Sequence, residues 1–390
     1  MWLVRLRRPA AALMLSPCSP SKLRIRSTVA AGLFALTHAF VAGAQPQLAI
    51  GANSGSPRSA VPVSVTLSGA GNSISAIQFD LSCDSDAIHL SFTAGAAVRT
   101  AGKSLYTAVM GPGSERVLIV GLDQASLPDG VLLNLLAGIP DGTAAGTYTL
   151  LLSNVAAVGP DGTSVALVAS AGAITADPSV PAAPLRPEGV LNAASWQSGP
   201  VASGEILVLI APGVGSLGPP STLSVWFDQN PAQILAVAAD QLMVLVPSLA
   251  APAGQVPVTV QYQGQIWAET TVATASAAPG LFTASGTGVG QGAILNQDST
   301  INSPSNPAAV STIISLFGTG MSAGGNLPPP SVTVGGLNAD VLYFGPAPGL
   351  PGVFQINCRI PSGAGHGLST PVAVQISSAS SQDGVRVALR

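Results

Sequence analysis

The chain has 390 residues, of which only 8% are charged and 47% are hydrophobic. This balance excludes a disordered chain, which needs low hydrophobicity and high charge. Six of the 14 Lys and Arg precede residue 30, so the rest of the chain is acidic and lacks the clustered basic residues that bind nucleic acid or a membrane surface.

The amino-terminal segment has the pattern of an export signal. Three basic residues between 22 and 26 precede an apolar run over 29–41, and Ala42-Gly43-Ala44 fits a signal-peptidase site. The apolar run is shorter than the about 20 residues that a membrane span needs. We therefore predict a bacterial-type signal peptide over 1–44, removal before Gln45, and a secreted or cell-surface protein without a membrane span.

The next stretch shows the period-two alternation of half-buried strands. Segments such as 61–67, 77–81 and 147–151 alternate apolar with polar residues, and Gly, Pro, Asn or Asp follows them. Antiparallel strands with one buried face have this pattern, and the period of a long helix is missing. We predict an all-β module over 45–176, in which Cys83 continues the buried face of 77–81 as a free thiol.

Four prolines within 177–187 predict an extended, fairly stiff linker after this module. Beyond the linker, strand-like segments recur in one order. The matching pairs are 190–192 with 294–296, 204–210 with 311–317, 223–225 with 332–334, 241–247 with 355–361, and 256–260 with 370–374. Two copies of one strand order predict two similar immunoglobulin-like β-sandwiches, over 188–279 and 280–390.

The first module resembles a cohesin domain. The stretches that carry this resemblance are 63–67, 77–81, 114–121, the turn at 128–130 and the closing strand at 172–175. The resemblance implies a jelly-roll β-sandwich over about 48–176 that binds a dockerin module or a polysaccharide. The resemblance supports the fold more strongly than it supports the identity of the ligand.

The repeat resembles immunoglobulin-like domains of the IPT/TIG type, because an apolar strand ends in the Gly-rich turn of 332–336. Residues 280–390 are also similar to the Solibacter-type C-terminal domain. The matching stretches are 278–282, 302–308, 315–320 and 347–353. These resemblances imply a fold and export but no reaction. The predicted fold class is thus all-β, with a cohesin-like jelly-roll sandwich followed by two immunoglobulin-like β-sandwiches.

One motif points to a different function. Gly320-Met-Ser-Ala-Gly324 has the G-x-S-x-G spacing, and Asp340 and His366 follow in the order of α/β-hydrolases. That chemistry needs Ser322 between a strand and a helix, whereas the prolines at 328–330 oppose a helix there. We predict no catalytic residue, and an accessory extracellular hydrolase that acts through Ser322 stays the alternative.

Trp226 and Trp267 are the candidate binding residues. An outward tryptophan can stack on a sugar ring or anchor a protein partner, whereas packing at the edge of a core is the alternative interpretation. Neither Cys83 nor Cys358 has a Cys or His partner at ligand spacing, so we predict no metal site, no disulfide and no cofactor.

The sequence thus predicts an exported, non-enzymatic binding or scaffold protein. Its first module would contact a polysaccharide or a protein of the dockerin type, with a link to polysaccharide catabolism, and the two later modules would act as spacers. Its low charge leaves a surface that repels other molecules weakly, which favours association. A purely structural protein of the cell envelope is the remaining alternative.

Overall fold

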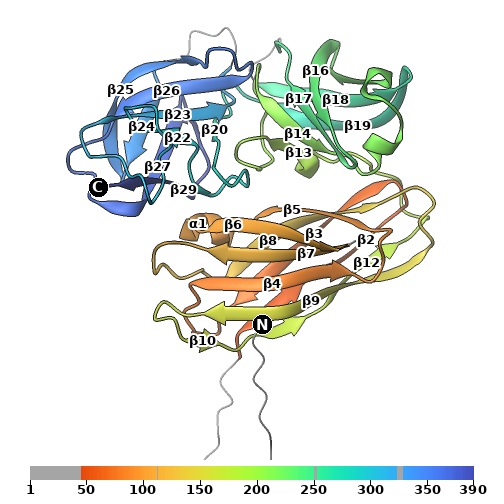
Figure 1. The fold of residues 1–390 in the computed structure, drawn as a ribbon. Helices are drawn as coiled ribbons and strands as arrows, with labels where there is room; N and C mark the ends of the chain where they lie inside the picture. Colours follow the sequence, from red (N-terminus) through yellow and green to blue (C-terminus); the bar gives the residue numbers. More distant parts are fainter. Residues whose placement is uncertain (1–44, 112, 250–252, 323–327) are drawn as a thin grey trace, which may run out of the picture. The chain divides into compact units, whose positions relative to one another are not determined.

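The structure is a computed structural model, and it describes residues 45–111, 113–249, 253–322 and 328–390. The described residues form one compact unit. The predicted signal peptide over 1–44 lies outside the described residues. Strands dominate the unit (Figure 1), so the predicted all-β fold class is confirmed. None of the helices in the described ranges is long and apolar enough to cross a membrane.

The first part of the chain folds into two sheets around one apolar core. One sheet has the order β11-β1-β3-β8-β5, and the other has the order β2-β12-β9-β4-β7-β6, with β10 paired to β9. The bounds are β1 (Gln47–Ile50), β2 (Ala52–Gly55), β3 (Ser59–Ser68), β4 (Ala76–Cys83), β5 (His89–Ala94), β6 (Ser104–Gly111), β7 (Ser114–Val120), β8 (Gly130–Ile139), β9 (Gly146–Val158), β10 (Ser164–Val165), β11 (Val168–Ser170) and β12 (Gly172–Ala176).

The alternation seen in the sequence explains which side of each strand is buried. Every second residue of β3 from Val61 to Leu67 is buried, and the same holds in β4 from Ile77 to Leu81. A short helix, α1 (Ala96–Ala101), adds buried alanine and valine side chains to the same core. It ends at Gly102, whose φ of 63° lies in the left-handed region that glycine adopts without strain.

The middle of the chain forms a sheet in the order β13-β14-β17-β16-β15-β18-β19. Its strands are β13 (Val190–Asn192), β14 (Ile206–Ile210), β15 (Leu223–Phe227), β16 (Asn230–Val237), β17 (Gln241–Leu245), β18 (Gly254–Tyr262) and β19 (Gln265–Thr274). Short 3-10 helices lie at η1 (Pro187–Gly189), η2 (Val214–Ser216) and η3 (Pro220–Thr222). β16 pairs first with β15 and then with β17, so the sheet folds over its own core.

The last part forms a sheet in the order β20-β23-β26-β25-β24-β27-β29-β21, with β22 on β23 and β28 on β27. Its strands are β20 (Gly280–Leu281), β21 (Gly290–Gln291), β22 (Ile294–Leu295), β23 (Ile313–Thr319), β24 (Ser331–Val334), β25 (Leu337–Pro346), β26 (Val353–Arg359), β27 (Gly367–Ile376), β28 (Ala379–Ser380) and β29 (Val385–Leu389).

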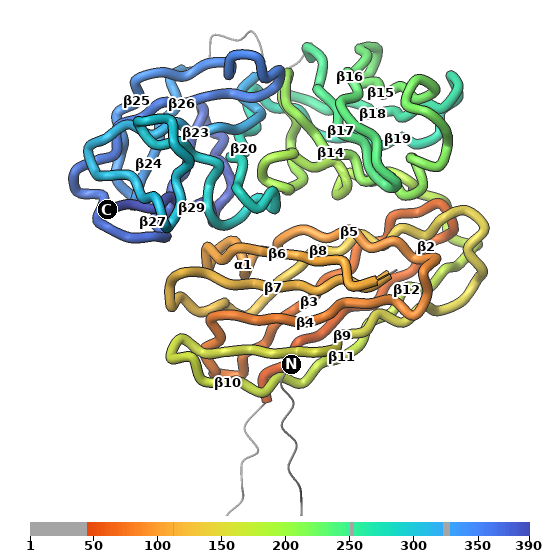
Figure 2. Tube along the Cα trace, viewed as in Figure 1, coloured from red at the N-terminus to blue at the C-terminus, as the bar shows by residue number. Residues whose placement is uncertain are grey.

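These two later sheets share one strand order. β14-β17-β16-β15-β18-β19 corresponds to β23-β26-β25-β24-β27-β29, and Figure 2 traces the first set mainly in green and the second in blue. The repeated sequence segments fall on corresponding strands, for example 223–225 on β15 and 332–334 on β24. The repeated sequence therefore encodes a repeated topology.

The proline-rich segment 177–187 is packed against the strands beside it. The Ala183 N–H donates to Ser59 Oγ over 3.0 Å, and the Ala60 N–H donates to the Ala183 carbonyl over 3.1 Å. Leu185 is buried in the core of the middle sheet. These contacts fix the path of the segment, so it is more than a spacer.

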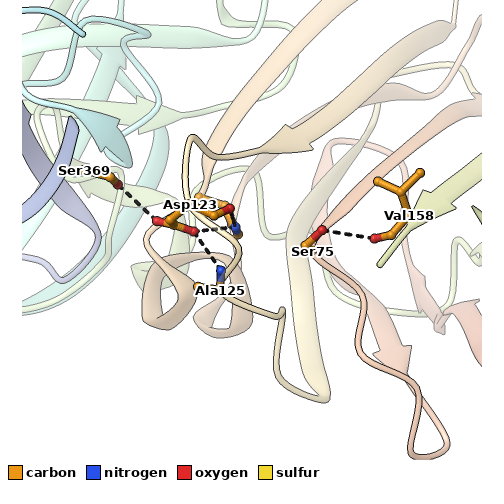
Figure 3. Close-up of polar contacts among 6 residues, drawn as sticks. Ser75, Asp123, Ala125, Val158 and Ser369 are labelled. Atoms are coloured by element: carbon orange, nitrogen blue, oxygen red, sulfur yellow. Dashed lines mark hydrogen bonds and ion pairs between the residues drawn. The ribbon is translucent and has the colours of Figure 1, made fainter. Parts of the chain in front are cut away.

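Side chains from the last part of the chain complete the first core. Val289 is fully buried among the core residues of the first two sheets, and Thr287 Oγ1 donates to the Leu105 carbonyl over 3.2 Å. Figure 3 shows Ser369 Oγ donating to Asp123 Oδ2 over 3.1 Å. These contacts bind residues far apart in the sequence into the compact unit.

Candidate functional site

In the first part of the chain, one face of the sheet that contains β4 and β9 points away from the core. β6, β7, β4 and β9 lie side by side in this sheet (Figure 1). Tyr106, Leu118, Gln78 and Ala156 form one row across the four strands, because opposed residues in an antiparallel ladder share a face. We call these outward side chains the outer face. It comprises Gln78, Asp80, Ser82, Ser104, Tyr106, Ala108, Ser114, Arg116, Leu118, Leu151, Ser153, Ala156 and Val158.

An ion pair lies at the centre of the outer face. The Asp80 carboxylate accepts hydrogen bonds from Arg116 Nε (2.7 Å) and Nη2 (2.9 Å), and from Asn154 Nδ2 (2.7 Å). The hydrogen bonds from Arg116 and Asn154 lower the pKa of Asp80 to about 2. Asn154 has a φ of 50° where a bulge interrupts the pairing of β4 with β9. Asp80 is 7% exposed, and its charge is balanced within the chain by Arg116.

Exposed apolar side chains lie on the outer face and at the edge of its sheet. Tyr106 is 48% exposed, and Leu151 and Val158 are exposed at the other side of the sheet. At the tip of the β6–β7 hairpin, Val109 is 76% exposed and Met110 is also exposed. Exposed apolar side chains that gather on one face mark it as a candidate interaction surface. No group of three His, Cys, Asp or Glu that could hold a metal ion occurs in the described parts of the chain.

The comparison with protein families bears on this part of the chain. The family model of the Cohesin domain matches residues 46–176. Residues 46–176 are a cohesin domain. The cohesin resemblance predicted from the sequence is therefore confirmed for the first module, whereas the IPT/TIG and Solibacter-type resemblances of later residues stay predictions.

Several solved structures of cohesins are similar to part of the chain. The sixth cohesin of scaffoldin B from Acetivibrio cellulolyticus, in complex with a Cel5 dockerin, is 26% identical, and the match covers 34% of this chain and 100% of that chain with a TM-score of 0.32. The Coh-OlpA–Doc918 complex from Clostridium thermocellum gives 17% identity, 34% and 100% coverage, and a TM-score of 0.32. A non-cellulosomal cohesin from Archaeoglobus fulgidus is 19% identical, and the match covers 34% of this chain and 92% of that chain with a TM-score of 0.30. No curated protein matches the chain.

The two tryptophans predicted as binding residues lie outside the cohesin domain. Trp226 is half-buried on β15, and its Nε1–H donates to Ser224 Oγ over 3.1 Å. Trp267 is half-buried on β19 and packs against the core of the middle sheet. Both rings therefore have contacts within their own sheet, and a binding role for them stays a prediction.

The three residues of the alternative hydrolase hypothesis lie on separate segments. Ser322 follows β23, Asp340 is exposed on β25 opposite Arg359, and His366 is exposed in the turn before β27. No hydrogen bond joins the side chains of these three residues among those that the structure describes. Gly324, the last residue of the motif, lies outside the described residues. Nothing in this arrangement supports a catalytic triad, in which nucleophile, base and orienting acid are linked by hydrogen bonds.

The two cysteines of the described residues are free. Cys358 is fully buried on β26, and burial raises the pKa of its thiol to about 12. Cys83 is only half-buried, so the prediction that this thiol is buried is wrong. It packs against the core from the last position of β4, where the strand leaves the sheet. Both thiols behave as small apolar side chains rather than as nucleophiles.

Sequence reasoning missed the ion pair of the outer face. Arg116 and Asn154 lie 36 and 74 residues from Asp80 in the chain, so only the strand register brings them together. A weak signal was present, because Asp80 occupies a polar position of the alternating segment 77–81 and Arg116 occupies one within 114–121. Opposite charges on two neighbouring strands suggest a cross-strand pair.

Proposed function

We propose that the cohesin domain binds a protein partner of the dockerin type through the outer face. The observation that supports this proposal is that exposed apolar side chains share one face with an ion pair that is already satisfied. A partner that covers this face removes apolar surface from water without breaking the hydrogen bonds of Asp80. The match of residues 46–176 to the Cohesin domain adds the class of partner, since cohesin domains mediate contact with dockerins in non-catalytic scaffolds.

The composition of the outer face suits a protein rather than a small molecule. The centres of protein interfaces are poor in unpaired charge and rich in Tyr and Met, and Tyr106 and Met110 are both exposed here. Four strands about 4.8 Å apart and about eight residues long provide roughly 500 Å². A stable complex buries about 800 Å² on each partner. A partner that forms a stable complex therefore extends beyond the four strands.

Binding by immobilised full-length chain to a panel of recombinant dockerins, including the Cel5 dockerin and Doc918, tests the proposal. Tyr106→Ala and Leu151→Asp are the informative variants, because both side chains lie on the outer face and are exposed. We expect each to weaken binding about tenfold or more, as truncation or charging of an interface anchor does. Leu122→Asp is the matched control, since Leu122 is exposed on the same domain but lies outside the four strands that form this face.

Two results would count against the proposal. Retention of no dockerin by the unaltered chain would leave a structural role as the better explanation. Equal loss of binding in the Leu122→Asp control and the outer-face variants would show that the contact lies elsewhere.

The wider role that we propose is that of an exported, non-catalytic scaffold. The cohesin domain would recruit a dockerin-bearing protein, for example one that degrades polysaccharide, and the regions 188–279 and 280–390 would present it away from the point of attachment. The signal pattern over 1–44 supports export. Amino-terminal sequencing of the protein recovered outside the cytoplasm should begin at Gln45, and an intact amino terminus in that fraction would contradict this part of the proposal.

A further inference from the structure

A second candidate site lies against the other sheet of the cohesin domain. A cavity of about 520 Å³ opens between strands β3, β8 and β5 and the segment that follows β13. This volume lies in the range of roughly 300–1,000 Å³ that is typical of small-molecule sites. The cavity shares no lining residue with the outer face, so it is independent of the dockerin proposal.

The floor of the cavity is a row of short polar side chains. Ser64, Asn134 and Thr93 are directly opposed on β3, β8 and β5, so their side chains share one face of the sheet. None of the three side chains makes a hydrogen bond to another described residue. Together they offer two hydroxyl groups and one amide, each able both to donate and to accept.

An aromatic side chain forms part of the wall. Trp196 lines the cavity and also packs against the apolar cluster of Leu191, Val208 and Ile210. Its φ of 55° places a bulky residue in the left-handed region, which such residues rarely adopt. Asn192 Oδ1, which accepts two backbone N–H groups of the same turn, fixes this conformation. Strained residues of this kind often lie at binding sites.

We propose that this cavity binds a carbohydrate of one or two sugar rings. The C–H face of a pyranose stacks on the indole of Trp196, and its hydroxyl groups pair with Asn134 and the other polar groups of the floor. Gln197, whose side-chain amide also has no hydrogen bond among the described residues, and Glu188 at the exposed rim add further polar partners.

Other classes of ligand fit this cavity less well. A purely apolar ligand would cover Ser64, Thr93 and Asn134 without satisfying their hydrogen-bonding groups, which is unfavourable. Arg99 also lines the cavity, but its guanidinium donates a hydrogen bond to the Ala94 carbonyl, and an anion would meet the carboxylate of Glu188 as well. A polyhydroxylated ligand with one apolar face matches both the row of polar side chains and the aromatic wall.

The test titrates the full-length chain with four disaccharides, namely cellobiose, xylobiose, maltose and N,N′-diacetylchitobiose, by calorimetry and tryptophan fluorescence. We expect saturable binding of at least one of them with a change in fluorescence. Asn134→Ala should weaken that binding about fivefold or more, the effect of one lost hydrogen bond. Trp196→Ala should weaken it further, whereas Tyr343→Ala, which alters an exposed aromatic side chain on β25 away from the cavity, should leave the affinity unchanged.

The variants also separate this proposal from the first one. Asn134 is exposed, so Asn134→Ala should leave the fold and the circular dichroism spectrum unchanged, and dockerin binding by this variant should equal that of the unaltered chain. The proposal is overturned if none of the four disaccharides binds saturably, or if Asn134→Ala and Trp196→Ala bind as tightly as the unaltered chain.

Discussion

The buried carboxyl group of Glu205 predicts an unusual dependence of stability on pH. Its side chain is 1% exposed at the start of β14. Oε1 accepts a hydrogen bond from Asn192 Nδ2 over 2.8 Å, and Oε2 accepts one from the Ala202 N–H over 2.7 Å. Burial outweighs these two hydrogen bonds and raises the pKa of Glu205 from 4.5 to about 8.

The direction of the effect follows from proton uptake. Between pH 4.5 and pH 8 the folded chain holds a proton on Glu205 that the unfolded chain has released. The stability that the protonated group contributes is therefore complete below the unfolded-state pKa of 4.5. It is lost as the pH rises towards the folded-state pKa of about 8. The slope for one such group is about 1.4 kcal/mol per pH unit, so the free energy of unfolding should fall by about 4 kcal/mol between pH 5 and pH 8.

Glu205→Gln isolates this contribution. At pH 5 the variant should be less stable by about 1–3 kcal/mol, because its amide NH₂ faces a backbone or side-chain N–H instead of accepting from it. Residue 205 of the variant does not titrate, so it adds no pH dependence to the free energy of unfolding. The difference in free energy of unfolding between the two proteins should therefore shrink with rising pH and reverse above pH 7. Urea unfolding at pH 5, 6, 7, 8 and 9 measures both curves. Parallel curves for the two proteins would refute the reasoning.

Three further predictions concern other buried groups. Asp80→Asn should lower the free energy of unfolding at pH 7 by about 2 kcal/mol, and because the pKa of Asp80 is lowered to about 2, the difference should narrow as the pH falls towards 2 in urea titrations. Asp123→Ala should cost about 3 kcal/mol, since it leaves the buried Lys103 ammonium without its partner at 2.6 Å, and adding Lys103→Met should restore most of the loss in the same assay. In a chain that begins at residue 45, Ellman's reagent at pH 8 should leave Cys358 unmodified until unfolding and modify at most Cys83; rapid modification of both would contradict the burial described.

The sequence predicts strands well because its periodicity is local. The alternation within 61–67 and 77–81 correctly identified the buried faces of β3 and β4. The repeat between 188–279 and 280–390 pointed to corresponding strands for the same reason, since each matched segment is itself a strand. These features depend on a residue and its near neighbours, which a sequence displays directly.

The sites could not be predicted in this way, because each is assembled by register. Asp80 meets Arg116 and Asn154 only once β4 has paired with β7 and β9. In the same way, Thr93 becomes a neighbour of Asn134 only when β5 pairs with β8. A shift of one residue in either ladder would turn these side chains to the opposite face. Trp226 and Trp267 were chosen from the sequence by their residue type. Residue type carries no information about strand register, so it could not identify side chains that meet across strands.

The placement of the few charges suits the outer face of the cohesin domain to association with a protein rather than to a reaction. Asp80 is paired with Arg116, and Lys103 is paired with Asp123, so these carboxylates are already bound to cations within the chain. A reaction needs a polar group that is held ready but not satisfied, whereas association needs apolar surface that loses water. The outer face has the second property, with its polar centre satisfied internally and Tyr106 exposed beside it. Its chemistry therefore favours a partner that contributes shape and apolar area rather than charge.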